Sequence, residues 1–279
     1  MLTSAPLGVF DSGLGGLTVV RALRARLPAE HIVYLGDTAR VPYGTRSADT
    51  ILRYARSCAG LLTDRGVKAL VIACNTATAV ALDMLRAELD LPVVGVIEPG
   101  ARAAVGIAAR LSHEGDPRSG RVGVLGTART IASGAYTRAV GALSTRLEVV
   151  GQAAPLLVPL VEEGWLAGDV PRLAVERYLA PLIEAEVGTI VLGCTHYPLL
   201  KDVIEEAAAR LAGRSVAVID SAEATAESVE DLFRTRSLAG ASRASGELEL
   251  LVTDLPSSFT AVAERFLGEA ARNVTQIDL

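Results

Sequence analysis

The hydrophobic and polar positions of this chain alternate between two patterns along its whole length. Short apolar runs are typical of buried strands, and longer stretches with apolar residues every three or four positions are typical of helices. Strands are predicted at Leu7–Phe10, Ile32–Leu35, Ala69–Ala73, Val93–Ile97, Val122–Leu125, Leu147–Val150, Thr189–Leu192, Ser215–Ile219 and Leu248–Val252. Helices are predicted at Leu14–Arg26, Ser47–Arg65, Thr76–Leu89, Pro171–Glu186, Leu199–Leu211 and Ser258–Leu267. This alternation predicts an α/β fold with mainly parallel sheets flanked by helices.

Two short segments recur in the second half of the chain. GVFDS at 8–12 is echoed by GVLGT at 123–127, and VIACNT at 71–76 is echoed by VLGCTH at 191–196. Each pair alone is short enough to arise by chance, but the two pairs have similar offsets. Since ligands bind beyond the carboxyl ends of parallel strands, we expect two pseudosymmetric halves with one cleft between them. Each half would bring one cysteine to that cleft.

This repeat suggests where the domains divide. We assign residues 1–97 and 212–279 to a first domain that carries Cys74, and residues 98–211 to a second domain that carries Cys194. The polar segment HEGDPRSG at His113–Gly120 is the best candidate for a linker. The Ser-, Ala- and Gly-rich segment Ser237–Gly246 is expected to be a surface loop.

Composition excludes several classes of protein. Half of the residues are hydrophobic, the formal net charge is −5, and no dense run of Lys or Arg offers a surface for nucleic acid. Met1 to Pro6 lacks the pattern of a signal peptide, and the uncharged runs are shorter than the about 20 residues that span a bilayer. We therefore expect a cytoplasmic protein with a small-molecule partner and no contact with membranes. Three cysteines and three histidines argue against a disulfide framework and against a metal cluster.

Cys74 and Cys194 each follow an apolar strand and precede a helix-like stretch. A cysteine at a helix N-terminus has its thiolate stabilised by the helix dipole and nearby amides. The alternative is a buried and inert thiol, which is the usual fate of a free cysteine. His196 could tune Cys194 or exchange protons with it, or could simply cap the helix. Cys58 lies inside a helix-like run, where core packing is the better interpretation.

The segment FDSGLGG places Asp11 and Ser12 at a strand end, before a glycine-rich turn. Free backbone amides at such a turn can hold an anion. A dinucleotide site fits poorly, because Thr18 stands where the third glycine of that motif belongs. Asp11 could bind an ammonium group or cap the helix.

Further candidates lie in loops and at helix starts. Pro42, Tyr43 and Gly44 are compatible with a substrate loop or with a plain turn. Thr127 and Thr130 could bind a carboxylate or only cap a helix. Glu162 could orient His196 or face solvent.

Taken together, these motifs resemble the glutamate racemase family. The stretches that carry the resemblance, in chain order, are GVFDSGLGGLTV, GDTARVPYG, ACNTAT, GVIEPG, GVLGT, LGCTHYPLL and VIDSAEATA. They cover nearly the whole chain, and the paired ACNT and GCTHYP segments are specific. One departure is visible: family members often have cysteine before the proline of QAAPLLVPLVEEG, where this chain has Ala154.

The resemblance implies racemisation of glutamate, without metal or other cofactor, to supply D-glutamate for peptidoglycan. Cys74 would take the proton from D-glutamate and Cys194 from L-glutamate, with Asp11 and His196 assisting and Glu162 orienting His196. The residues implied to bind the amino acid are Ser12, Tyr43, Gly44, Asn75, Thr76, Thr127 and Thr195. Family members commonly dimerise, so a homodimer is expected.

Independently of the resemblance, pyridoxal phosphate would need a Schiff-base lysine. The chain has only Lys68 and Lys201, and neither follows the carboxyl end of a predicted strand. Three alternatives remain open: a racemase for aspartate or a hydantoin, a nucleotide-binding module, and a non-catalytic protein that binds acidic amino acids.

Overall fold

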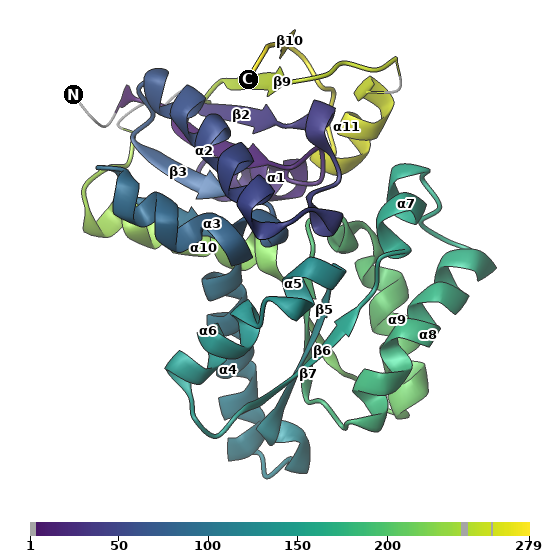
Figure 1. The fold of residues 1–279 in the computed structure, drawn as a ribbon. Helices are drawn as coiled ribbons and strands as arrows, with labels where there is room; N and C mark the ends of the chain where they lie inside the picture. Colours follow the sequence, from purple (N-terminus) through teal and green to yellow (C-terminus); the bar gives the residue numbers. More distant parts are fainter. Residues whose placement is uncertain (1–3, 241–244, 258) are drawn as a thin grey trace. The chain divides into compact units, whose positions relative to one another are not determined.

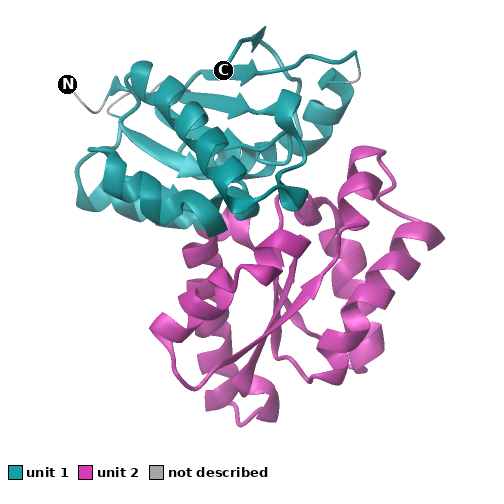
Figure 2. Cartoon of the chain, in the orientation of Figure 1, with its two compact units in different colours: residues 1–96, 225–279 teal, residues 97–224 magenta. Residues whose placement is uncertain are grey.

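The computed structural model describes residues 4–240, 245–257 and 259–279. The chain divides into two compact units (Figures 1 and 2). Unit 1 comprises Met1–Val96 and Thr225–Leu279, and unit 2 comprises Ile97–Ala224.

Unit 1 is built on a sheet with the strand order β10-β9-β2-β1-β3-β4. Its strands are β1 (Leu7–Asp11), β2 (Ile32–Gly36), β3 (Ala69–Ile72), β4 (Val93–Gly95), β9 (Leu248–Val252) and β10 (Val274–Gln276). Every strand pair described in this sheet is parallel. The central strands β1, β2 and β3 are buried at every position. This is why they are nearly continuous apolar runs rather than alternating ones.

The helices of unit 1 are α1 (Leu17–Arg26), α2 (Ala48–Asp64), α3 (Asn75–Glu88), α11 (Phe259–Leu267) and most of α10 (Ser221–Thr235). Helix α2 shows why the sequence favours a helix here. The Ser47 hydroxyl caps it by accepting the Thr50 N–H at 3.3 Å. Its buried residues recur at helical spacing and join the core of the unit, which also includes residues of α3. They are Ile51, Ala55, Cys58, Ala59 and Leu62.

Unit 2 contains a smaller sheet with the order β6-β5-β7-β8. Its strands are β5 (Arg121–Gly126), β6 (Glu148–Ala153), β7 (Thr189–Gly193) and β8 (Ala217–Asp220). Its helices are α4 (Ile97–His113), α5 (Ala128–Ala132), α6 (Ala135–Leu143), α7 (Leu157–Glu162), α8 (Asp169–Glu184) and α9 (Lys201–Ala212). Across the described residues of both units, no helix combines the length and apolar character needed to cross a membrane.

The two units share one strand topology. In unit 1 the order β2-β1-β3-β4 matches β6-β5-β7-β8 in unit 2, and all of these strand pairs are parallel. The sequence echoes fall on equivalent strands: GVFDS covers the end of β1 and GVLGT the end of β5, whereas VIACNT begins at the end of β3 and VLGCTH at the end of β7. The α/β fold with parallel sheets flanked by helices is therefore confirmed. Cys74 follows the third strand of unit 1 after one residue, Ala73, and Cys194 comes directly after the third strand of unit 2.

Several details of the predicted organisation differ. The second unit ends at Ala224 rather than at residue 211, because β8 pairs with β7 and so belongs to the sheet of unit 2. The predicted linker His113–Gly120 is wrong: it lies inside unit 2, as the end of α4 and a short 3₁₀ turn at Pro117–Gly120. Helix α11 begins at Phe259, and the predicted start at Ser258 lies outside the described residues, as do residues 241–244 of the expected loop.

Candidate active site

The carboxyl end of β1 carries Asp11, which is almost fully buried. Its Oδ2 accepts the Gly13 N–H at 3.0 Å, and the Tyr34 hydroxyl donates to the Gly13 carbonyl at 2.7 Å. These two bonds fix the glycine turn that joins β1 to α1. The interpretation of Asp11 as a helix N-cap is wrong, because the N-cap of α1 is Gly16; the Asp11 carboxylate instead holds a backbone amide of the turn before the helix.

Glycine is required at position 16 by a close approach. A Cβ added there would lie 2.5 Å from the Asp11 Cβ, which is nearer than real Cβ atoms come, and 3.0 Å from the Ala73 Cβ, which is a tight contact. The start of α1 can therefore lie against Asp11 and the end of β3 only because Gly16 has no side chain.

Cys74 is the N-cap residue of α3, with 6% of its surface exposed. Its Sγ accepts the Ala77 N–H at 3.4 Å and lies 3.3 Å from the Ser12 Oγ. The predicted placement of a thiol at a helix N-terminus is thus confirmed for Cys74, and the structure brings Ser12 to the same sulfur; it is wrong for Cys194, which precedes a 3₁₀ turn, Tyr197–Leu200. An amide and the positive end of the helix dipole both stabilise negative charge on this sulfur. Asn75 and Thr76 follow as the buried first residues of α3.

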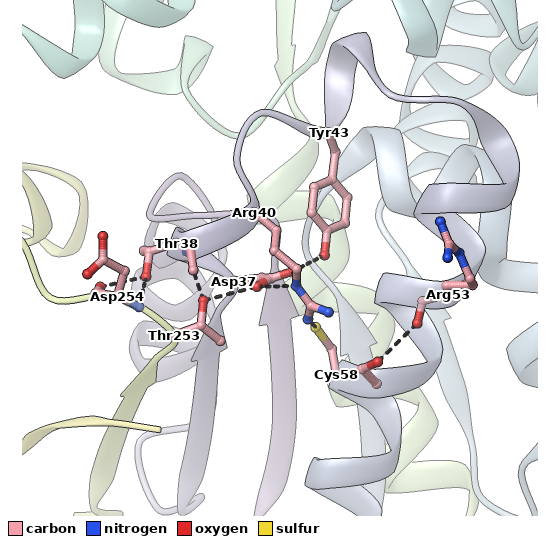
Figure 3. Close-up of polar contacts among 10 residues, drawn as sticks. Asp37, Thr38, Arg40, Tyr43, Arg53, Cys58, Thr253 and Asp254 are labelled. Carbon is pink, nitrogen blue, oxygen red and sulfur yellow. Dashed lines mark hydrogen bonds and ion pairs between the residues drawn. The ribbon is translucent and has the colours of Figure 1, made fainter. Parts of the chain in front are cut away.

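The segment of Pro42, Tyr43 and Gly44 leads into a short 3₁₀ turn, Tyr43–Thr45. Pro42 is exposed, Gly44 is half-buried and Tyr43 is buried. The Tyr43 hydroxyl donates to the carboxylate of Asp37, which follows β2 (Figure 3). The phenol therefore faces the protein interior, and a ligand would meet this residue through its backbone.

In unit 2, Cys194 follows β7 and is 5% exposed. His196 Nδ1 lies 3.9 Å from the Cys194 Sγ and 3.5 Å from the Thr195 Oγ1. On the other side of the ring, His196 Nε2 lies 2.9 Å from the Glu162 Oε1, at the end of α7. The structure thus brings together Glu162, His196 and Cys194 in one hydrogen-bonded row.

The pKa of His196 reflects two opposing causes. Burial lowers it, but the hydrogen bonds with Cys194 and Glu162 and the negative charge of these groups outweigh burial, so the pKa rises to about 10. The imidazole is therefore protonated at neutral pH. The ring lies within hydrogen-bonding distance of the Cys194 sulfur, so a proton can pass between the two groups.

The equivalent of the β1 turn in unit 2 follows β5. Thr127 caps α5, and its Oγ1 accepts the Thr130 N–H at 3.2 Å and lies 3.0 Å from the Thr130 Oγ1. The capping interpretation is correct for Thr127, whereas Thr130 lies within α5 and supplies the amide that Thr127 caps. Thr130 is buried, whereas Thr127 is half-buried.

Three buried side chains near these residues were not predicted. Tyr197 donates to the Ala154 carbonyl at 2.8 Å, which ties the segment after Cys194 to the start of the segment that leads to Glu162. The Tyr136 ring lies close to Gly193, directly before Cys194. Asp37 has no exposed surface and stands at the carboxyl end of β2, as Asp11 does at the end of β1. That strand-end position is the signal that could have identified Asp37 from the sequence.

Cys58 and Lys68 lie in the interior of unit 1. Cys58 has no exposed surface, lies in the core of unit 1, and has its pKa raised to about 12, mainly by burial. The prediction that Cys58 packs in the core is confirmed. Lys68 precedes β3 and forms a buried ion pair with Glu30. Among the residues that the structure describes, no group of three His, Cys, Asp or Glu side chains is arranged to hold a metal ion.

Comparison with known proteins assigns the family. Residues 17–229 match the Asp/Glu/Hydantoin racemase family. The chain is 48% identical to a glutamate racemase of Geobacter metallireducens, over 98% of this chain and 96% of that protein. It is similar to the crystal structure of Thermus thermophilus glutamate racemase in complex with β-chloro-D-alanine, with a TM-score of 0.86, 43% identity and coverage of 99% and 98%. The Francisella tularensis glutamate racemase in complex with D-glutamate gives a TM-score of 0.88 at 34% identity, with the same coverage. The chain therefore belongs to the Asp/Glu/Hydantoin racemase family.

Proposed function

We propose that this protein is a glutamate racemase, which interconverts L- and D-glutamate and supplies D-glutamate for peptidoglycan. The observation that carries the proposal is the pair of cysteines at equivalent positions of one repeated topology, Cys74 after β3 and Cys194 after β7. The high identity to glutamate racemases over nearly the full chain favours glutamate over aspartate or a hydantoin.

The reaction needs two acid/base groups, because a proton must leave one face of the α-carbon and another must arrive on the opposite face. We assign Cys74 to the proton of D-glutamate and Cys194 to the proton of L-glutamate. The Ala77 amide and the α3 dipole stabilise Cys74 as a thiolate base. Ser12 holds the sulfur from the other side at 3.3 Å, and Asp11 assists from the neighbouring strand end.

Cys194 has a proton partner of its own. His196 carries a proton at neutral pH and lies 3.9 Å from the sulfur, and Glu162 fixes the ring through Nε2. This row can stabilise the thiolate before it takes a proton and can return a proton afterwards.

The intermediate with a deprotonated α-carbon is stabilised by donors around the substrate carboxylates, where its charge develops. We assign binding of the substrate to backbone, hydroxyl and amide groups of the segments that follow β1, β2, β3, β5 and β7. They are Ser12, Pro42, Tyr43, Gly44, Asn75, Thr76, Thr127, Thr130 and Thr195. The first six belong to unit 1 and the last three to unit 2. A homodimer, implied by the family resemblance, and a cytoplasmic location, inferred from the sequence pattern, stay predictions.

The test is racemisation of L-glutamate by the purified protein with nothing added, followed by circular dichroism, with α-proton exchange in deuterated water. Cys74→Ala and Cys194→Ala should each lower kcat about 10²- to 10⁴-fold, the usual contribution of a positioned acid or base. Cys58→Ala is the matched control, because it removes a thiol that lies in the core, and its kcat should stay close to that of the wild type.

Three outcomes would contradict the proposal. Normal turnover by Cys194→Ala would refute the two-thiol scheme. Faster exchange with aspartate than with glutamate would assign a different substrate. Tight binding of glutamate without any exchange would indicate a binding protein.

A further inference from the structure

Asp37 is the centre of a buried polar cluster that the reaction does not use directly. The cluster comprises Asp37, Arg40, Tyr43 and Thr253, and Figure 3 shows all four side chains meeting at the Asp37 carboxylate. We propose that Asp37 is a positioning residue that sets the backbone of residues 42–44 for binding glutamate, by holding the Tyr43 phenol. The inference rests on the proposed function, because it concerns how that segment meets the substrate.

The carboxylate is matched to its donors. Arg40 Nε lies 2.8 Å from Oδ1 and 2.7 Å from Oδ2, the Tyr43 hydroxyl donates to Oδ2, and the Thr253 hydroxyl donates to Oδ1 at 3.0 Å. A carboxylate accepts about four hydrogen bonds, so these donors use most of its capacity. Asp37 has no exposed surface, and Arg40 supplies the one positive charge that such a buried anion requires.

The geometry also fixes Tyr43 as a donor. Burial and the nearby Cys58 and Asp37 raise the pKa of Tyr43 well above its usual value, so the phenol keeps its proton throughout the working range of pH. The ring has 1% of its surface exposed and lies against Tyr54, with a centroid distance of 5.5 Å. Arg40 stacks over the same Tyr54 ring at 4.3 Å. Tyr43 therefore cannot shift without breaking a bond to a buried charge.

Asp37 joins three parts of unit 1 that are distant in sequence. It follows β2, it binds Tyr43 in the candidate substrate segment, and through Thr253 it reaches the residue after β9. The Ala39 N–H donates to the same Thr253 hydroxyl at 2.8 Å. Asp37, Thr38 and Ala39 thus all bond the residues that follow β9, and Asp37 is the one of these that also accepts the Tyr43 hydroxyl.

Two variants weaken this attachment in different ways. Tyr43→Phe keeps the ring and removes the only hydroxyl that ties the substrate segment to Asp37. Asp37→Asn keeps the shape, removes the charge, and places an NH₂ group among side chains that are themselves donors. Neither residue touches the reacting atoms through its side chain in this proposal, so the effect should fall on binding of the substrate rather than on the chemical step.

The experiment measures KM and kcat in both directions for the wild type, Tyr43→Phe, Asp37→Asn and the double variant. We expect each single variant to raise KM about tenfold, as for loss of about 1.4 kcal/mol of binding, with kcat changed less than about threefold. The double variant should resemble the more affected single variant, because both changes break one bond. Thr38→Val is the matched control: its hydroxyl bonds Asp254 at 2.6 and 2.8 Å but not Asp37, so KM should not change.

The outcomes separate cleanly. Thermal melting checks that each variant folds. An unchanged KM in both Tyr43→Phe and Asp37→Asn, or a KM effect that Thr38→Val reproduces, would overturn the inference. Additive effects on KM would also overturn it, because two additive changes do not act through one bond. If the wild type fails to racemise glutamate, the proposed function fails instead.

Discussion

The row formed by Glu162, His196 and Cys194 makes a quantitative prediction about one carboxylate. Glu162→Gln keeps a hydrogen-bond acceptor near His196 Nε2 but removes the negative charge. Two unit charges at the observed 2.9 Å interact by about 1.4 kcal/mol at the dielectric constant of water, about 80. That energy corresponds to about one pKa unit.

The water-like value is appropriate because the Glu162 side chain is 51% exposed, although His196 itself is buried. Losing the carboxylate therefore lowers the pKa of His196 from its value of about 10, while Cys194 continues to raise it. The charged imidazolium is favoured in the folded state, so the stability it contributes is complete below about pH 6.5 and is lost as pH rises towards 10. In Glu162→Gln this stability should be lost at a pH about one unit lower than in the wild type.

The assay is an NMR titration of ring-labelled histidine. The chain has three histidines, and His31 and His113 are exposed, so they are internal references that should not move. Glu163→Gln is the matched control, because it removes an exposed charge next to Glu162 in the sequence that makes no described contact with His196. The alkaline limb of kcat/KM should move with the titration of His196. Titration of His196 near pH 6.5 in the wild type, or an equal shift in Glu163→Gln, would refute the reasoning.

Two further predictions concern unit 1. Cys58 has its pKa raised to about 12 and no exposed surface, so it should resist iodoacetamide at neutral pH in the folded protein; mass spectrometry should find it alkylated only after denaturation. Labelling of Cys58 before Cys74 would contradict this. Gly16→Ala forces a Cβ to within 2.5 Å of the Asp11 Cβ. Urea denaturation should therefore show that the free energy of unfolding falls by about 1–3 kcal/mol, and kcat should also be lower. Gly60 lies inside α2, and a Cβ added there would meet no atom within 4 Å. Gly60→Ala should therefore leave the free energy of unfolding unchanged or raise it by up to about 1 kcal/mol. If Gly60→Ala lowered the free energy of unfolding as much as Gly16→Ala does, close approach to Asp11 would not be the cause.

The sequence predicted the elements that are buried and regular. The runs at β1, β2 and β3 were recognisable because both faces of these strands are covered, which requires continuous apolar residues. Strand β10 was missed because it has three residues, Val274–Gln276, that are half-buried or exposed and leave no apolar pattern. Helix α4 was missed because Pro99 and Gly100 resemble a loop, although proline is tolerated in the first turn of a helix.

The site residues that lie at strand ends could be predicted from the sequence, but the side chains that contact them could not. Cys74 and Cys194 were distinguished from Cys58 by position alone, since a strand end offers a helix N-terminus and the interior of a helix does not. The bond between Asp37 and Thr253 joins residues 216 positions apart, and no local pattern records it. The buried orientation of Tyr43 could not be predicted either, because a Pro-Tyr-Gly turn is compatible with a ring that faces solvent.

The repeated topology supplies two sulfurs at equivalent places, but their surroundings differ. Cys74 caps a regular helix and is held by an amide and by Ser12, whereas Cys194 is followed by a 3₁₀ turn and has a protonated imidazole beside it. The equilibrium constant between mirror images is unity, so kcat/KM must be equal in the two directions at every pH, however unequal the two thiols are. The asymmetry of the surroundings can therefore appear only in kcat and KM taken separately, or in the isotope effects of the two α-protons. Loss of the Glu162 charge should accordingly change the kcat of one direction more than the other while the ratio of the two kcat/KM values stays fixed.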